Sequence, residues 1–180
     1  MQIFLTCILP ICILACSCTR PSQPPLATVK NFSPEKYAGQ WHEVARLPNF
    51  FERDLVAAKA TYVLLTDGKL SVYNEGLKEN GKRTSIRGAA TAVGGTPDGE
   101  AKLEVRFDRF PASLFVGDYW ILHLNDAYTL AVVGSPNRKF LWLLAKDPEA
   151  KVDDFTAGIK LMKASGFAME ELIHNPWRID

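Results

Sequence analysis

Residues 31–46, NFSPEKYAGQWHEVAR, combine the signals of a short helical turn with those of a strand that follows it directly. Ser33 can accept hydrogen bonds from the free amides at the start of a helix, and Pro34 suits the first helical position. Gly39 can adopt the unusual backbone angles that end such a turn, which releases Trp41 onto the strand. We therefore predict one helical turn that leads straight into a β-strand.

Short apolar or alternating segments separated by turn residues fill the chain over residues 41–148. Asp67-Gly68 and Asn80-Gly81 stand between such segments, and these pairs are the strongest short-range signals of a hairpin. Tight turns without intervening helices make neighbouring strands antiparallel, and closure into a barrel removes the exposed edges. The predicted strands are 41–47, 59–65, 69–77, 82–92, 101–108, 116–124, 128–134 and 140–146.

One amphipathic helix is predicted after the strands, at residues 153–166. Phe155, Ile159 and Met162 recur at helical spacing, and Gly166 closes the segment. The last two predicted strands are apolar on both faces, so they need the outer cover that such a helix provides. The whole pattern predicts an all-β fold, an eight-stranded antiparallel up-and-down calyx barrel with a short N-terminal helical turn and one C-terminal α-helix.

Gly39 and Trp41, with the short helix before them and Glu-Val-Ala-Arg after them, resemble the first signature region of lipocalins. The likeness is closest to the bacterial outer-membrane lipoprotein group related to apolipoprotein D. Asp126 and Tyr128 lie where lipocalins carry a second signature, and a third is similar around Lys146, where the family has arginine. The resemblance implies structural roles for these five residues, with Trp41 plugging the closed end of the barrel.

All four cysteines lie within the first 18 residues, which argues against a disulfide framework or a cysteine metal site in the body of the chain. Residues 3–15 are almost wholly apolar and too short for a comfortable membrane span, as in a secretory signal. The segment that ends at Cys16 resembles a bacterial lipobox. We predict a lipoprotein signal peptide at 1–15, a lipidated Cys16 with a proline-rich tether at 16–30, and a lipocalin domain at 31–180.

The alternatives at the N-terminus are modification of Cys18, simple secretion and a retained membrane anchor. In the bacterial lipoprotein scheme, Ser17 after the lipidated cysteine resembles an outer-membrane address. The resemblance therefore implies a protein anchored by lipid to the outer membrane, with its domain facing the periplasm.

The charged residues and histidines exclude several classes of function. A net charge of +1, from 21 basic and 20 acidic residues, gives no electrostatic signature of nucleic-acid binding. His42, His123 and His174 lack the spacing of metal ligands, and the body of the chain has no nucleophile motif or phosphate loop. We predict no metal, no cofactor, no nucleic-acid partner and no enzymatic activity.

An eight-stranded barrel can be filled by its own side chains or can hold one small ligand, so the fold alone does not give the function. Strict alternation over 101–107 is taken to turn Phe107 inward. The resemblance implies that large side chains at comparable positions line a cavity, whereas a solid barrel plugged by Trp120 and Trp142 is the alternative. The predicted ligand-binding residues are Phe50, Phe51, Tyr62, Phe107, Trp120, Leu122 and Trp142.

Two pairs of residues carry further expectations about the ends of the barrel. Phe50 and Phe51, in the loop at the presumed open end, either cover the ligand or pack on the rim. Arg46 and Lys146 are expected at the closed end, with the alternative that a buried cation meets a ligand carboxylate.

The predicted function is to bind, store or transport fatty acids or lysophospholipids in an apolar cavity at the outer membrane, in support of membrane maintenance. A scavenger of another small apolar molecule and a lipid-modifying enzyme are the alternatives. The expected partners are thus a lipid or other apolar ligand and the outer membrane itself. A homodimer is compatible with the resemblance, although no surface stripe in the sequence demonstrates it.

Overall fold

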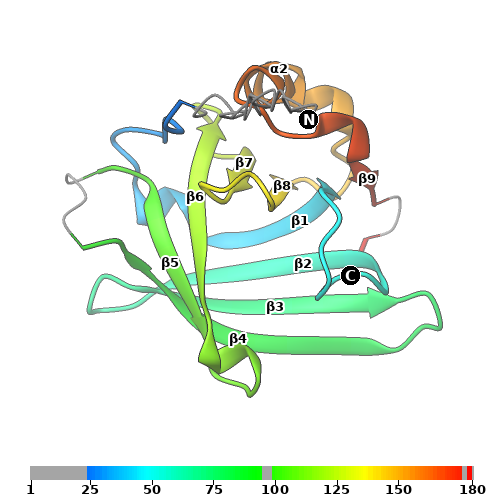
Figure 1. Ribbon diagram of the computed structural model, residues 1–180. Coiled ribbons are helices and arrows are strands. Elements are labelled where there is room, and N and C mark those ends of the chain that lie inside the picture. Colours follow the sequence, from blue (N-terminus) through cyan, green and yellow to red (C-terminus); the bar gives the residue numbers. More distant parts are fainter. Residues whose placement is uncertain (1–23, 95–98, 176–177, 180) are drawn as a thin grey trace, which may run out of the picture.

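The computed structural model describes residues 24–94, 99–175 and 178–179. Eight antiparallel strands wind into a closed barrel with a helix on its outside (Figure 1). The strands pair in chain order from β2 to β8, and β1 closes the barrel by pairing with both β8 and β2. They are β1 (Gly39–Arg46), β2 (Leu55–Leu64), β3 (Leu70–Lys78), β4 (Arg83–Ala92), β5 (Lys102–Phe107), β6 (Val116–Leu124), β7 (Leu130–Gly134) and β8 (Leu141–Ala145). The predicted fold class is confirmed.

The short helix α1 (Pro34–Tyr37) closes one end of the barrel. Ser33 caps it, since its Oγ accepts a hydrogen bond from the Lys36 amide at 3.3 Å. Gly39 has a φ of +117°, a conformation that residues with a Cβ rarely adopt, and it turns the chain into β1. Trp41 then points into the barrel, where it is fully buried and stacks on Tyr37 at 4.6 Å between ring centroids.

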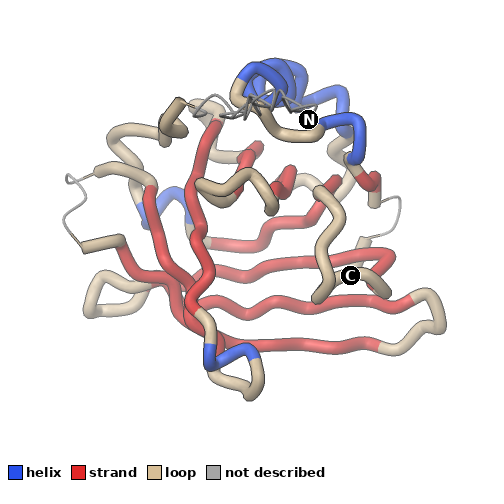
Figure 2. Tube along the Cα trace, viewed as in Figure 1, coloured by secondary structure: helices blue, strands red, loops and turns tan. Residues whose placement is uncertain are grey.

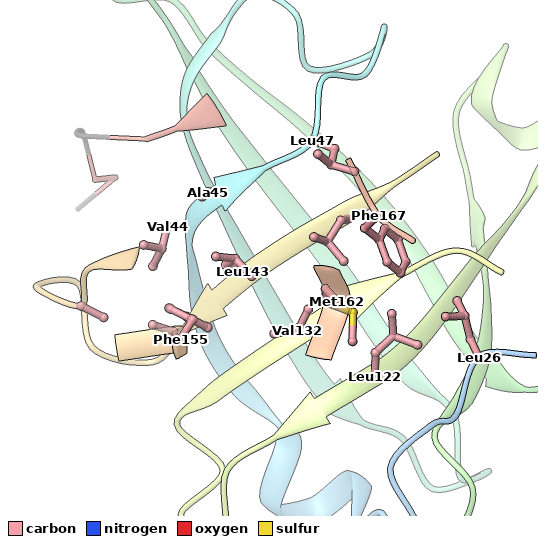
Figure 3. Close-up of a cluster of buried hydrophobic side chains, with 13 residues drawn as sticks. Leu26, Val44, Ala45, Leu47, Leu122, Val132, Leu143, Phe155, Met162 and Phe167 are labelled. Atoms are coloured by element: carbon pink, nitrogen blue, oxygen red, sulfur yellow. The ribbon is translucent and has the colours of Figure 1, made fainter. Parts of the chain in front are cut away.

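Helix α2 (Thr156–Ala164) lies on the outer face of the barrel wall and follows a 3-10 turn (Val152–Phe155). The helical region predicted as one element over 153–166 is therefore divided into this turn and α2. Figure 2 shows the helical segments in blue on the outside of the barrel. Phe155 and Met162 pack against Val132 and Leu143 in an apolar layer between helix and wall (Figure 3). This layer explains why β7 and β8 are apolar on both faces.

A ninth strand, β9 (Ile173–His174), was not predicted from the sequence. It pairs with Ala45 and Arg46 on the edge of β1 that β2 leaves free, because β2 pairs with β1 only over residues 39–42. Two residues with no apolar alternation give no sequence signal for a strand. Two further 3-10 turns, Ala112–Leu114 and Met169–Glu171, precede β6 and β9.

The barrel domain begins before residue 31. Leu26 is buried in the layer under α2, and the Val29 amide donates to the Ile121 carbonyl at 2.9 Å. The prediction that the tether extends to residue 30 is therefore wrong for residues 24–30, which pack on the barrel. The predicted signal peptide, Cys16 and Cys18 lie outside the described residues.

Within the part of the chain that the structure describes, no helix has the length and apolar character needed to cross a membrane.

Candidate ligand-binding lumen

The closed half of the barrel is solid. Inward-facing side chains fill it, and nearly all of them are fully buried. The buried members of this inner core are Tyr37, Trp41, Tyr62, Leu70, Val72, Ala90, Ala101, Leu103, Val105, Ile121, Ala131, Val133 and Leu144. This half is filled by its own side chains, but not by Trp120 and Trp142, which the alternative of a solid barrel named as plugs.

Toward the open end, side chains on the same inward faces become accessible to solvent. Asn74 and Ile86 are cross-strand partners one step beyond the buried Val72, and both are half-buried. Phe107 and Trp142 pack against the inner core on the side of the open end, and they are likewise half-buried. Solvent therefore reaches inward-facing side chains in the open half of the barrel, which is filled less completely than the closed half and is the candidate lumen.

The predicted lumen residues divide between the two faces of the wall. Tyr62, Phe107 and Trp142 belong to the inner core or pack on it. The prediction that Trp120 and Leu122 face the lumen is wrong, because both pack in the outer layer under α2, where Figure 3 shows Leu122 near Met162.

The register of β6 gives the physical reason for this inversion. Trp120 pairs with Lys102, which lies on the outer face of β5, whereas Tyr119 pairs with the inward Leu103. A bulge between Ile121 and His123 then shifts the alternation further along the strand. Tyr119 and Ile121 are therefore the inward residues that sequence reasoning missed.

Three tyrosines form a polar floor at the base of the lumen. The Tyr119 hydroxyl lies 2.7 Å from the Tyr37 hydroxyl and 2.8 Å from the Tyr62 hydroxyl. Burial raises the pKa of all three phenols, so they stay neutral at physiological pH. This tyrosine trio has three hydroxyl protons, and the two hydrogen bonds between its members use two of them. The third proton can be donated to a polar atom outside the trio.

A buried charged cluster forms the lumen wall where β1 approaches the open end. The Arg46 Nη1 donates to Glu43 Oε1 and to Asn175 Oδ1, both at 2.9 Å. Its Nη2 donates to the carbonyls of Glu52 at 2.8 Å and Leu55 at 3.1 Å. Asn175 joins the same cluster by donating from Nδ2 to Glu43 Oε1 at 2.6 Å.

Glu52 brings a second carboxylate to this cluster from the β1–β2 loop. Its Oε2 accepts hydrogen bonds from Trp142 Nε1 at 3.0 Å and Asn49 Nδ2 at 2.6 Å, and it lies 3.6 Å from Arg46 Nε. Burial and the neighbouring Glu52 raise the pKa of Glu43 to about 8. Two carboxyl groups thus share one guanidinium.

These contacts correct the expectation for Arg46. It lies toward the open end of β1, where Nη1 and Nη2 donate to protein oxygens, whereas Nε has no hydrogen-bond partner and lies 3.6 Å from Glu52 Oε2. Both Nη groups are therefore already paired with protein oxygens, and the Glu52 carboxylate beside the guanidinium makes this wall unfavourable for an anion.

The mouth is lined by the β1–β2 loop and the β3–β4 hairpin. A pocket of about 380 Å³ there is bordered by Phe50, Phe51, Arg53, Asp54, Leu55, Lys78 and Thr84. The Phe51 ring lies 5.6 Å from Phe140 and 6.3 Å from Trp142, whereas Phe50 projects into solvent. Phe51 thus packs on the rim, and Trp142 connects the rim to the lumen.

The signature residues of the closed end hold α1 in place. Lys146 Nζ donates to the carbonyls of Lys36 at 2.8 Å and Ala38 at 3.1 Å, and it lies 5.2 Å from the centroid of the Trp41 ring. A lysine thus covers the tryptophan as a point charge, without the planar stacking of a guanidinium. The Tyr128 hydroxyl accepts a hydrogen bond from the Ser33 amide at 3.1 Å.

Two other residues of interest lie on the outside. Asp126 is exposed in the β6–β7 turn, where Asn125 makes the hydrogen bonds to the Thr129 and Leu130 amides. His42 is on the outer face of β1 opposite Lys59, and burial together with that cation lowers its pKa. Among the described residues, no group of histidine, cysteine or acidic side chains could hold a metal ion.

Comparisons with known proteins agree with this geometry. Residues 33–177 match the family model of the lipocalin-like domain. Temperature-induced lipocalin-1 of Arabidopsis thaliana is 33% identical, over 84% of this chain and 82% of the relative. The outer membrane lipoprotein Blc of Vibrio cholerae is 34% identical, over 81% of this chain and 83% of the relative. The structure of insecticyanin from the tobacco hornworm Manduca sexta is similar with a TM-score of 0.69 at 22% identity, covering 86% of each chain.

Proposed function

Because this chain belongs to the lipocalin family, we propose that it binds a single-chain lipid, a fatty acid or a lysophospholipid, in the open half of its barrel. Lipocalins are generally binding and transport proteins, and we propose such a role here rather than catalysis. The observation that carries the proposal is that Phe107, Trp142 and Ile86 face inward and yet are only half-buried. An acyl chain that covers them gains about 0.8 kcal/mol for each buried methylene.

The charges around the lumen support an arrangement in which the head group stays at the mouth. Glu52 disfavours an anion beside Arg46, whereas Arg53 and Lys78 border the mouth pocket, where Lys78 Nζ also lies 3.4 Å from Asp54 Oδ2. A phosphate or carboxylate at this rim can pair with these cations while the chain occupies the lumen.

We also propose that the protein is anchored to the outer membrane by a lipid on Cys16, with the barrel facing the periplasm. Its relatives named outer membrane lipoprotein Blc support this location. More than one acyl chain is needed for stable anchoring, as a lipidated N-terminal cysteine of this kind provides. Such an anchor would keep the protein beside its ligand source for storage or transport in membrane maintenance.

A second candidate ligand is a compact apolar molecule with a polar atom at its buried end. The tyrosine trio favours it, because one of its three hydroxyl protons is free for an acceptor. An acyl chain has no hydrogen-bond acceptor at its buried end, so with such a ligand only water could accept that proton.

Native mass spectrometry of protein purified from its host membrane tests the proposal. We expect a non-covalent adduct with the mass of a fatty acid or lysophospholipid, lost on denaturation, whereas the covalent anchor would persist. An adduct of another chemistry would favour the second candidate. Absence of any adduct, with no change in tryptophan fluorescence on titration with a lysophospholipid, would contradict ligand binding.

Two tryptophans on opposite faces of the wall provide a matched test of the site. Trp142→Ala removes a lumen wall and the partner of Glu52, so we expect lysophospholipid affinity to fall about tenfold, equivalent to about 1.4 kcal/mol. Trp120→Ala removes an equally half-buried ring from the outer layer and should leave affinity unchanged. Equal losses in both variants would show that the effect comes from a disturbed barrel and would contradict a lumen site.

A further inference from the structure

Large apolar side chains are exposed on loops at the open end of the barrel. On the β5–β6 loop, Phe110 is 75% exposed, Leu114 67% and Phe115 66%, and on the β1–β2 loop Phe50 is 73% exposed. Soluble proteins rarely gather large apolar side chains on one end without a partner for them. The open end therefore has the apolar surface of a docking site.

Backbone hydrogen bonds hold the β5–β6 loop in a conformation that exposes its apolar side chains. The Leu114 amide donates to the Pro111 carbonyl and the Phe115 amide donates to the Ala112 carbonyl, both at 3.1 Å. These bonds form the 3-10 turn Ala112–Leu114, whose side chains do not contribute to either apolar core. The loop thus presents its apolar side chains outward as an ordered element.

Basic residues surround these apolar side chains. The four segments at the open end, residues 47–54, 78–83, 108–116 and 135–140, contain seven basic and four acidic residues, a net charge of +3. The whole chain has a net charge of only +1, so the rest of the molecule is slightly acidic. Apolar and aromatic side chains among cations match the interface of an anionic bilayer, where the rings enter the head-group region and the cations meet lipid phosphates.

We infer that the open end of the barrel docks on an anionic lipid bilayer through the exposed side chains of the β1–β2 and β5–β6 loops. The lumen would then open directly onto the membrane surface, and a single-chain lipid could pass between them without crossing bulk water.

The path of the N-terminal segment gives an independent reason for this orientation. Arg138, in the β7–β8 loop at the open end, donates from Nη2 to the carbonyl of Pro24. The chain then runs to the closed end, where the Phe32 amide donates to the Gly99 carbonyl at 2.9 Å. If Cys16 is lipidated, the eight residues from it to Pro24 span at most about 28 Å, so the lipid would hold the open end of the barrel near the membrane. This argument about orientation depends on the proposed lipid anchor at Cys16. The exposed apolar side chains and the positive charge of the open end do not depend on it.

Hydrogen exchange of the lipidated protein in lipid nanodiscs tests the docking. We expect amides of residues 108–116 to exchange several-fold more slowly in discs of phosphatidylcholine with phosphatidylglycerol than in phosphatidylcholine alone. The closed-end β2–β3 loop, residues 65–69, should exchange equally in both. Equal exchange of the open-end loops in both lipids would overturn the inference.

A pair of double variants separates docking from a general loss of apolar surface. Phe110→Ser with Phe115→Ser should abolish the added protection of residues 47–54 by anionic lipid. Val63→Ser with Leu65→Ser removes side chains that are 53% and 40% exposed near the closed end, and it should leave that protection intact. Loss of protection in both double variants, or in neither, would contradict docking through the open end.

Two further outcomes distinguish this inference from its alternatives. Protection that rises with protein concentration in lipid-free detergent solution would identify a second copy of the chain as the partner and overturn docking on lipid. An acyl adduct without protection of the open end would overturn the docking and leave the proposed ligand intact, whereas protection without an adduct would support the docking and contradict the ligand.

Discussion

Two carboxyl groups share one guanidinium in the lumen wall, and Glu43 is the more deeply buried of the two. Burial and the charge of Glu52 raise its pKa from 4.5 to about 8. Between these pH values the folded protein binds a proton that the unfolded chain has released. The free energy of unfolding therefore decreases as the pH rises through this window, by up to about 1.4 kcal/mol per pH unit from this group.

Glu43→Gln removes this titration while it keeps an oxygen that can accept from Arg46 and Asn175. We expect the stability of the variant, measured by urea unfolding from pH 5 to pH 8, to depend less steeply on pH than that of the natural protein. Glu75→Gln, at a partly exposed ion pair on the outer wall, should leave the slope unchanged. An unchanged slope in Glu43→Gln would show that Glu43 is already ionised throughout this range.

At the scale of single residues, the sequence shows which residue types a strand contains, but not which face of the barrel wall each side chain occupies. Glu43 and Arg46 are three residues apart, so regular alternation would place them on opposite faces of β1. A bulge between Glu43 and Ala45 brings both to the lumen side. Asn175 completes the cluster from a distant part of the chain, and no local pattern predicts such a contact. The tyrosine trio, drawn from three separate elements, was missed for the same reason.

At the scale of elements, helix α2 depends on a glycine for its contact with the barrel. A Cβ added at Gly158 would lie 2.7 Å from Val132 Cγ2 and 3.2 Å from His123 Cδ2. Alanine is the better helix former by about 1 kcal/mol, but here it would push the helix away from a close-packed wall.

We expect Gly158→Ala to destabilise the protein by about 1–3 kcal/mol in urea unfolding, despite the gain in helix propensity. Ala157→Gly, on the exposed side of the same turn, should cost only about 1 kcal/mol, the difference in propensity. If Gly158→Ala instead raised the unfolding midpoint, the close packing of α2 on β7 would be incorrect.

The elements themselves were largely predictable, because each depends on local signals. The eight strands, the capped turn of α1 and the position of α2 follow from alternation, hairpin glycines and helical spacing. The face of β6 was not predictable, since VGDYWILHL is apolar at both Trp120 and Ile121. Only pairing with β5 and the bulge after Ile121 decide which of them faces inward.

At the scale of the whole molecule, the question is where along the chain the folded barrel domain begins. The strands and helices that the structure describes run from Pro34 to His174. Residues 24–30 follow no strand or helix pattern, so they are predicted from the sequence to belong to the tether. They nevertheless contribute Leu26 to the outer layer, and Val29 forms main-chain hydrogen bonds to Ile121 and Ala101.

Two truncations test where folding stability begins. We expect residues 24–180 to fold without the N-terminal segment into a β-rich barrel with a single cooperative unfolding transition, measured by circular dichroism in urea. A chain that starts at residue 31 loses the burial of Leu26 and leaves the Ile121 carbonyl and the Ala101 amide without their partner. We expect it to be less stable by about 2–4 kcal/mol. Leu26→Ala in the longer chain should reproduce part of this loss, because it removes the side chain and keeps both hydrogen bonds. Equal unfolding midpoints for the two truncations would mean that residues 24–30 are tether, as their composition suggests, and that the barrel is complete without them.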